Sequence, residues 1–159
     1  MTDDLPVGQN AYFLEDLAPG TRLVTQGRTV TETDGLLWAM FTGDMNPMHV
    51  DETFAASHGL FGGRFPPGLM VVALASGLKE RTGAFAGTGL AMLSQTVHYQ
   101  EVVLPGDTVH VQLTVRAAEP RSGKRDGRVT FDYQVVTDGG VIAISGEWVM
   151  LVRARAAGA

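Results

Sequence analysis

The second half of the chain alternates apolar and polar side chains, which is the pattern of antiparallel strands with one buried face. This period of two runs through three stretches, near 108–115, 128–135 and 142–152. A polar stretch at Ser122–Gly127 and the hairpin signal Asp138–Gly140 separate them. The pattern therefore predicts at least three consecutive strands of one sheet.

Two further strands are expected upstream, near Thr21–Val30 and around Leu90–Val103. Residues 1–20 contain several turn formers and are interpreted as an N-terminal arm that leads into the first strand. The chain has no visible internal repeat and no linker-like stretch. The sequence therefore predicts one domain over residues 1–159.

Residues Gly68–Leu78 are apolar on nearly every face, and a helix of this kind must be surrounded by protein. Lys79, Glu80 and Arg81 are expected to mark its emergence into solvent. The helix and the strands bury their apolar faces together if the sheet curls around the helix. The predicted fold class is α+β, a single antiparallel sheet wrapped around a central buried helix, which is the hot-dog arrangement. Such a sheet leaves an edge strand exposed, so a homodimer or higher homo-oligomer is expected.

A shorter helix is expected before residue 43. Thr31 is a candidate N-cap, and Asp34 stands at the third helical position, as in a capping box. Three apolar residues then follow at helical spacing and predict an amphipathic helix: Leu37, Met40 and Phe41. Gly43 is expected to end this helix.

The segment after Gly43 is predicted to be a structured loop that does not continue the helix. Pro47 favours an extended conformation for Asn46, the residue before it. Asp51 is expected to cap a short helix over 52–57.

Composition narrows the class of protein. With 159 residues and 45% hydrophobic residues, the chain can enclose an apolar core. It has no cysteine, which excludes disulfides, thiolate metal sites and cysteine nucleophiles. A net charge of −5 argues against broad nucleic-acid binding, although a few local cations can still hold a polyanionic small ligand.

A membrane location is not expected. The acidic N-terminus lacks the apolar core of a signal peptide. The longest apolar run, Gly68–Leu78, is much shorter than the ~20 residues that cross a bilayer. We therefore expect a cytoplasmic protein.

Asp44 and His49 are the first candidates for chemistry. They lie five residues apart in a segment shaped by Gly43 and Pro47. A carboxylate and an imidazole can orient a water molecule, remove one of its protons and return a proton to a nearby carbon. Alternatively, Asp44 caps a turn and His49 is packed or solvated. The surrounding Asn-Pro turn and the downstream glycine favour the functional interpretation.

Gly68 is the second candidate, because it stands where the buried helix begins. The N–H groups of a first helical turn have no intrahelical partner and favour developing negative charge. Without a side chain at Gly68, a carbonyl oxygen can approach the backbone closely. An alternative with equal support is that Gly68 merely lets the Pro-Pro turn enter the helix.

Ser76 is a weaker candidate. It could hydrogen-bond an active-site side chain, but a serine inside a helix more often bonds its own backbone. No zinc pattern, phosphate loop or nucleophile elbow is present, so no metal and no organic cofactor is expected.

These motifs together resemble the MaoC-like hydratases, a family that includes the (R)-specific enoyl-CoA hydratases. The resemblance covers roughly residues 13–153. Its most specific part is a Gly-Asp-x-Asn-Pro-x-His segment followed by a glycine-started apolar helix. The matching stretches are Thr29–Asp34, Phe41–Asp51, Phe61–Arg64, Pro67–Met70, Val103–Asp107 and Gly146–Trp148.

The resemblance implies roles for individual residues. It makes Asp44 and His49 the catalytic dyad, and it gives Gly68 the backbone N–H that binds the thioester carbonyl. It also implies that Ser76 supports the site and that Asn46, with the proline after it, holds the loop in shape.

One position departs from the family pattern. Many members have histidine where this chain has Pro67, so the preferred acyl chain is left open. Several cations are candidates for the phosphates of CoA, with a solvated surface as the alternative role for each: Arg64, Arg121, Lys124, Arg125, Arg128, Arg153 and Arg155.

The implied activity is reversible addition of water to a 2-enoyl-CoA, with an (R)-3-hydroxyacyl product. The acyl chain would lie along Leu69–Leu78. Two alternatives stay open at this stage. One is an acyl-CoA thioesterase, because hot-dog domains also hydrolyse thioesters, and the other is a non-catalytic acyl-CoA-binding subunit of a hetero-oligomer.

Overall fold

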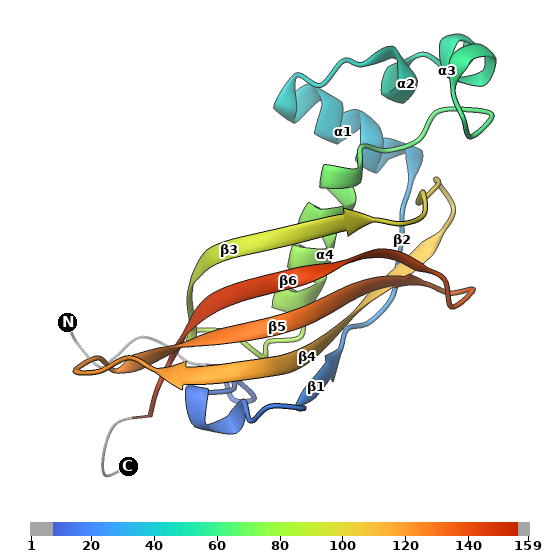
Figure 1. Cartoon of the computed structure of the whole chain (residues 1–159). Coiled ribbons are helices and arrows are strands. Elements are labelled where there is room, and N and C mark those ends of the chain that lie inside the picture. The colour runs from blue at the N-terminus through green and yellow to red at the C-terminus, as the bar shows by residue number, and fades with distance from the viewer. Residues whose placement is uncertain (1–7, 156–159) are drawn as a thin grey trace.

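A computed structural model describes residues 8–155 and places them in one antiparallel sheet with helices on one face. The first seven residues of the predicted arm lie outside this range. The strand order is β1-β4-β5-β6-β3, and β2 also pairs with β4 (Figure 1). The strands are β1 (Arg22–Val24), β2 (Arg28–Thr29), β3 (Gly89–Tyr99), β4 (Thr108–Pro120), β5 (Asp126–Thr137) and β6 (Ile142–Arg153).

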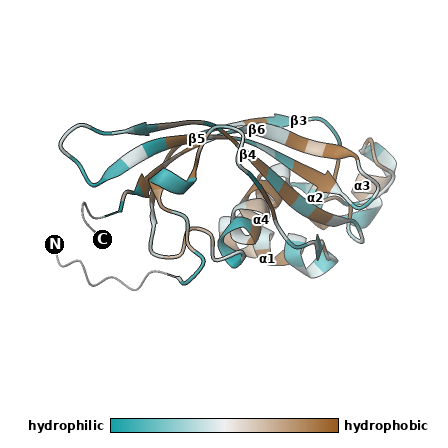
Figure 2. Cartoon of the chain, turned by 90° about the horizontal axis from the view of Figure 1, so that it is seen from below, coloured by the Kyte–Doolittle hydropathy of each residue, from teal (hydrophilic) through white to brown (hydrophobic). Residues whose placement is uncertain are grey.

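The central helix, α4 (Gly68–Arg81), lies against one face of the sheet, and α1 lies on the same side (Figure 2). A helical layer of α1 (Glu32–Thr42), α2 (Pro47–Val50) and α3 (Glu52–His58) gathers at the end where β3 finishes (Figure 1). The arm contains one 3-10 turn, η1 (Leu14–Asp16). The predicted α+β, hot-dog architecture is confirmed.

The core forms between α4 and the inward side chains of the long strands. The predicted alternation is confirmed on β4 and β5, where every second residue is buried. Burying each such side chain contributes roughly 1.5–3 kcal/mol. The inward set is Val109, Val111, Leu113, Val115, Val129, Phe131, Tyr133 and Val135. On α4 the buried set is Met70, Val71, Val72, Ala75, Leu78 and Lys79.

Lys79 corrects one prediction, because its side chain does not emerge into solvent. The residue is only 3% exposed. Its aliphatic stem lies among aromatic rings, with Nζ 5.4 Å from the ring centre of Phe85 and 5.7 Å from that of Trp148. The ammonium reaches the surface carboxylate of Glu80 at 2.6 Å, so the buried charge is paired.

The predicted apolar faces of α1 and α4 are only partly covered. The capping box of α1 is confirmed, since the Thr31 hydroxyl accepts the Asp34 N–H and the Asp34 carboxylate accepts the Thr31 N–H. Three predicted face residues of α1 are exposed instead of buried: Leu37, Met40 and Phe41. On α4, Leu69 is 54% exposed, so this helix is not surrounded by its own chain.

Between α1 and α4, the helix ends follow mostly from glycine, proline and capping residues in the local sequence. Gly43 ends α1 with a φ of 76°, as predicted. Asp51 caps α3 by accepting the Phe54 N–H at 2.9 Å. The predicted loop is wrong in one respect, because Pro47 opens the short helix α2, a place that suits proline.

The expected strands near the N-terminus and before β4 are shorter than predicted. The range Thr21–Val30 contains two short strands, β1 and β2, and the range Leu90–Val103 contains β3, which ends at Tyr99. Between residues 8 and 155, no helix has both the length and the apolar character of a membrane span.

Asp34 provides a test of the capping box. Burial raises its pKa, but hydrogen bonds from Thr31 and the charge of Arg28 outweigh that effect and lower the pKa overall. Its stabilising effect is therefore complete above the carboxyl's ordinary pKa and is lost as the pH falls through the lowered one. Asp34→Asn should reduce the free energy of unfolding at pH 7 by roughly 0.5–1 kcal/mol, measured by urea unfolding.

The matched control is Asp138→Asn, in the β5–β6 turn, which should change the free energy of unfolding by less than about 0.5 kcal/mol. The loss caused by Asp34→Asn should shrink as the carboxyl protonates in strong acid. An equal loss at neutral and strongly acidic pH would contradict the electrostatic explanation.

Candidate active site

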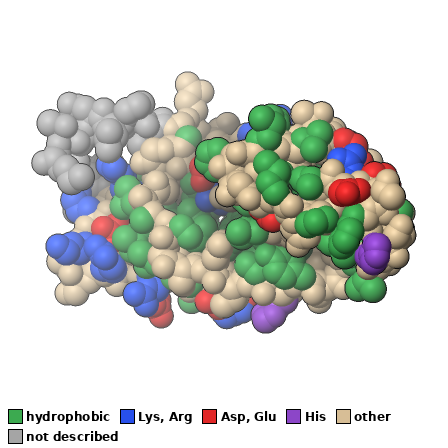
Figure 3. Space-filling model, turned by 90° about the horizontal axis from the view of Figure 1, so that it is seen from above, with side chains coloured by type: hydrophobic (Ala, Val, Ile, Leu, Met, Phe, Trp, Pro, Cys, Tyr) green, Lys and Arg blue, Asp and Glu red, His purple; other side chains and the backbone are tan. Residues whose placement is uncertain are grey.

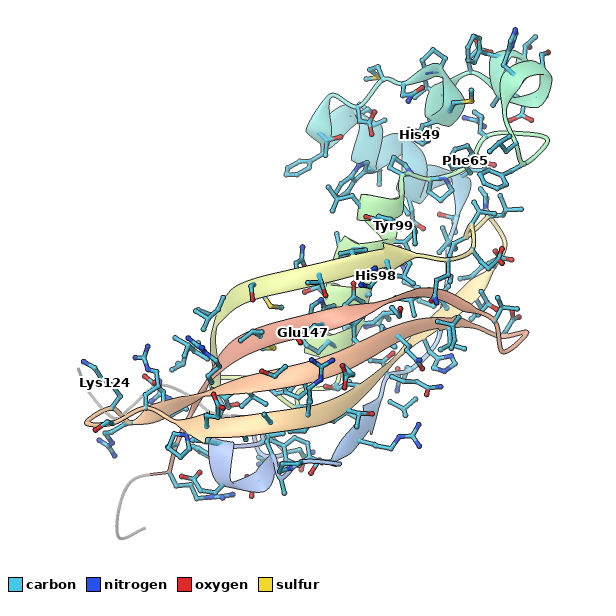
Figure 4. All side chains as sticks on the ribbon, viewed as in Figure 1. His49, Phe65, His98, Tyr99, Lys124 and Glu147 are labelled. Carbon is cyan, nitrogen blue, oxygen red and sulfur yellow. The ribbon has the colours of Figure 1, made fainter. Side chains whose placement is uncertain are left out.

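The imidazole of His49 is oriented by a backbone carbonyl. His49 lies on α2, and its Nδ1 is 2.7 Å from the carbonyl oxygen of Phe65. Because a carbonyl only accepts, Nδ1 must carry the proton, and Nε2 of the neutral ring then has a free lone pair. The Phe65 ring packs edge-on against the imidazole at 5.0 Å and fixes its plane. Figure 4 shows the two residues facing each other between the helical layer and α4.

Local structure places His49 at this point. The Asn46 side chain accepts the Met48 N–H at 3.1 Å and so caps α2. Pro47 occupies the first position of the helix, where its missing N–H has no cost. The turn therefore projects His49 from a short, rigid piece of backbone.

A cavity of about 600 Å³ opens beside His49. This volume falls in the range of small-molecule sites. Asn46, His49 and Gly68 all line it, so the structure brings three of the five predicted site residues together. Its other walls are mostly apolar and come from the segment before α4, the start of α4, the end of β3 with the residues after it, and β6. They include Phe61, Phe65, Leu69, Val71, Tyr99, Val103 and Ile144.

The first turn of α4 offers unpaired donors to this cavity. Pro67 is the N-cap, and its side chain makes no capping hydrogen bond. The carbonyl of Pro67 accepts the N–H groups of Met70 and Val71, whereas the Gly68 N–H has no acceptor among residues 8–155. The helix dipole adds partial positive charge at the same place. This turn can therefore stabilise an oxyanion.

Tyr99 explains the glycine at position 68 in a way that neither sequence interpretation anticipated. A Cβ on residue 68 would lie 2.5 Å from Cε1 of the Tyr99 ring. The ring therefore rests directly on the Gly68 backbone, at the cavity wall. Sequence reasoning missed Tyr99, because only pairing of β3 with β6 brings it to the start of α4.

Asp44 is half-buried and held by local hydrogen bonds. Its N–H donates to the Thr42 hydroxyl at 3.2 Å, and its Oδ1 accepts the Asn46 N–H at 3.5 Å. Asp44 is not among the residues that line the cavity. Within residues 8–155 no hydrogen bond or ion pair joins it to His49, so its role in a dyad stays a prediction.

Ser76 lies two turns beyond Gly68, about 12 Å along the helix axis. It is half-buried and does not line the cavity. Its supporting role also stays a prediction. Glu101, by contrast, lines the cavity and was not singled out from the sequence. The available signal was the polar pair Gln100-Glu101 directly before the apolar run Val102–Leu104.

Comparisons with known proteins identify the family of this chain. The family model described as MaoC like domain matches residues 15–138. Protein MaoC of Klebsiella aerogenes is 34% identical over 107 residues, which are 65% of this chain but only 30% of that protein. The chain thus spans less than a third of that relative.

Two relatives match over more of their own length. The 3-hydroxybutyryl-CoA dehydratase of Methylorubrum extorquens is 34% identical over 73% of this chain and 71% of its own. The (R)-specific enoyl-CoA hydratase of Rhodospirillum rubrum is 28% identical over 91% of this chain and 94% of its own. Both names denote hydro-lyases.

Solved structures share the fold. The MaoC-like dehydratase from Rhodospirillum rubrum superposes with a TM-score of 0.78 at 28% identity, covering 92% of this chain and 99% of that one. A double-hotdog protein from Mycobacterium tuberculosis gives a TM-score of 0.81 at 16% identity, with 94% of this chain covering 46% of that one. The chain therefore has the hot-dog fold and belongs to the MaoC-like domain family, the family of these hydro-lyases.

Proposed function

We propose that this chain catalyses the reversible addition of water to a 2-enoyl-CoA, giving an (R)-3-hydroxyacyl-CoA. One observation carries the proposal: the imidazole of His49 and the open first turn of α4 line the same apolar cavity. A conjugated thioester needs an acid–base group at its double bond and a hydrogen-bond donor at its carbonyl. The names of the relatives support the same reaction.

The proposed chemistry begins at the carbonyl. The thioester oxygen accepts the Gly68 N–H, which polarises the conjugated double bond. Asp44 and His49 hold a water molecule on one face of the alkene. As the water oxygen bonds to the β carbon, one of the two groups removes its proton and the other protonates the α carbon. Both protons are handled on one face, so the addition is syn.

In the proposed reaction, the first turn of α4 contributes to catalysis by stabilising the charge of the transition state. Negative charge moves onto the thioester oxygen in the transition state, where the Gly68 N–H is already in place. Removing one such donor typically costs about 3 kcal/mol of transition-state stabilisation. No metal or organic cofactor enters the proposed reaction.

We also propose that the chain forms a homodimer through β3. This strand is a sheet edge that pairs only with β6 among the described strands. Its side chains are nearly all exposed, including Leu90, Met92 and Leu93. An exposed, apolar edge of eleven residues is a ready template for a second strand. A second copy would bury it and supply the second half of a double hot-dog.

Crotonyl-CoA separates the candidate activities. Hydration should remove the enoyl absorbance without releasing a free thiol, and chiral analysis of the product should give the (R) isomer. Release of free thiol would instead identify a thioesterase. Binding without turnover would identify a non-catalytic subunit.

The dyad can be tested by removing each of its groups. Asp44→Asn and His49→Gln should each lower kcat for crotonyl-CoA by about 10²- to 10⁴-fold, with the circular dichroism spectrum unchanged. The matched control, Asp51→Asn, alters a carboxylate of the same segment that only caps α3 and should keep most of the activity. Full activity of Asp44→Asn would remove that carboxylate from the mechanism.

A double-mutant cycle tests how Gly68 acts. Alanine retains the backbone N–H, but its Cβ would collide with the ring of Tyr99. Gly68→Ala should therefore lower kcat/KM by roughly 10-fold or more in the wild-type background, but far less in a Tyr99→Ala background. Equal losses in both backgrounds would mean that the substrate itself, and not Tyr99, requires the glycine.

A further inference from the structure

Lys79 is the only charged residue that is buried among residues 8–155, with 3% of its surface exposed. The other cations are exposed or half-buried, and Figure 3 shows several basic side chains gathered at one end of the molecule. The Lys79 side chain instead enters the core, where Nζ lies 3.7 Å from Sδ of Met150 and 5.7 Å from the ring centre of Trp148. Glu80 pairs with the ammonium at 2.6 Å through a side chain that is 56% exposed.

Burial of this ammonium has a cost in free energy, because the charged group loses its hydration. Replacing a buried ion pair by apolar residues of similar volume is often neutral or stabilising. A methionine at position 79 could fill the same space beside Phe85, Met150 and Trp148. The stability of the fold therefore does not explain this lysine, which favours a role in binding.

Two further hydrogen-bond donors are buried near Lys79. The rings of Tyr133 and Trp148 stack with their centres 4.3 Å apart, and these residues are 1% and 0% exposed. Although the two side chains are in contact, neither the Tyr133 hydroxyl nor the Trp148 N–H has a well-aligned hydrogen-bond partner among residues 8–155. Burial raises the pKa of Tyr133 to about 12, so its hydroxyl is a neutral donor at physiological pH. An ammonium and two unpaired donors in apolar surroundings form a site for an anionic group.

The inner face of β6 connects these donors to the cavity. Ile144 lines the cavity, and the inward side chains of Trp148 and Met150 follow it on the same face of the strand. α4 runs alongside, with Gly68 at the cavity and Lys79 in the last turn, roughly 16 Å further along the helix axis. An acyl chain of medium length, extended from a thioester at the cavity, spans this distance.

We propose that Lys79 makes the enzyme selective for 2-enoyl-CoA substrates of medium length whose acyl chain ends in a carboxylate. This carboxylate replaces Glu80 as the partner of the Lys79 ammonium and also accepts the Trp148 N–H. Glu80 can turn into water, because its side chain is more than half exposed. The unbranched, flexible side chain of Met150 can give way to the acyl chain. The inference rests on the hydratase activity proposed above and names the substrate class of the same site.

A pair of substrates isolates the terminal group. The CoA thioester of trans-2-decenedioic acid, joined through the carboxyl group next to the double bond, has a carboxylate where trans-2-decenoyl-CoA has a methyl group. For the wild-type protein, kcat/KM for the first (the diacid substrate) should exceed that for the second (the monoacid substrate) by about 10-fold or more. An apolar tunnel gives the opposite order, because the carboxylate would lose its hydration without gaining a partner.

Lys79→Met should reverse this preference. For the diacid substrate, kcat/KM should fall by about 10-fold or more, mainly through KM, because the lost contact is far from the reacting carbons. The monoacid substrate should be hydrated at least as well as by the wild type. The free energy of unfolding, measured in urea, should be unchanged or higher. The matched control, Arg81→Met, removes an exposed cation from the same helical turn and should leave the substrate ratio unchanged.

Glu80→Gln separates a binding role of Lys79 from a structural one. The variant removes the competing partner of the ammonium, so kcat/KM for the diacid substrate should rise by roughly 2-fold or more, while that for the monoacid substrate stays constant. If the ion pair is only structural, both substrates should respond equally. An equal response would contradict the inference.

The remaining outcomes separate this inference from the proposed function. If the wild type prefers the methyl-ended substrate at this and every other chain length, Lys79 has no part in substrate selection, but the hydratase activity stands. Buried water would then be the partner of the unpaired donors. If Lys79→Met does not fold, the wild-type ratio and Glu80→Gln still decide. Failure of the wild type to hydrate crotonyl-CoA and both longer thioesters would overturn the proposed function and this inference together.

Discussion

The packing of α4 against one face of a single curved sheet is the constraint on which the other features depend. Burial of Val71, Val72 and Ala75 fixes the rotation of the helix, and this fixes where its first turn points. Gly68, whose N–H is unpaired within residues 8–155, consequently lines a cavity whose other walls come from distant parts of the chain. A helix start that was free to move would lose most of its electrostatic effect, because preorganised dipoles act only when they need not reorient.

The segment between the helical layer and α4 links the two chemical groups of the site. The Phe65 carbonyl orients the imidazole of His49, and three residues later the chain begins α4 at Gly68. His49 and Gly68, the acid–base group and carbonyl-binding donor of the proposed mechanism, are therefore both positioned by one short, proline-rich connection. Its two prolines restrict the backbone and keep the separation of the two groups constant.

The sheet that packs against α4 also has an exposed edge strand, β3. Among the described strands, β3 has a partner on one side only, and Leu69 in the first turn of α4 is exposed. Residues 8–155 thus leave one face of the helix and one edge of the sheet uncovered. The site and this uncovered surface meet at Tyr99, which belongs to both.

The sequence by itself determined the features that depend on neighbouring residues. Alternation predicted β4, β5 and β6, because inward and outward side chains repeat every second residue. The capping box of Thr31 and Asp34, the glycine end of α1 and the Asp51 cap also followed from local hydrogen-bonding chemistry. For the same reason, the segment with Asn46 and His49 could be identified as a shaped turn.

Only the tertiary structure decided the features that join distant residues. The carbonyl that orients His49 comes from 16 residues away, and the ring that rests on Gly68 arrives from another strand. Burial of Lys79 depends on Phe85 and Trp148, which no local pattern connects to α4. The local sequence likewise does not indicate that the apolar face of α1 is exposed. Such contacts are set by how elements pack in three dimensions, and the spacing of residues along the chain does not encode them.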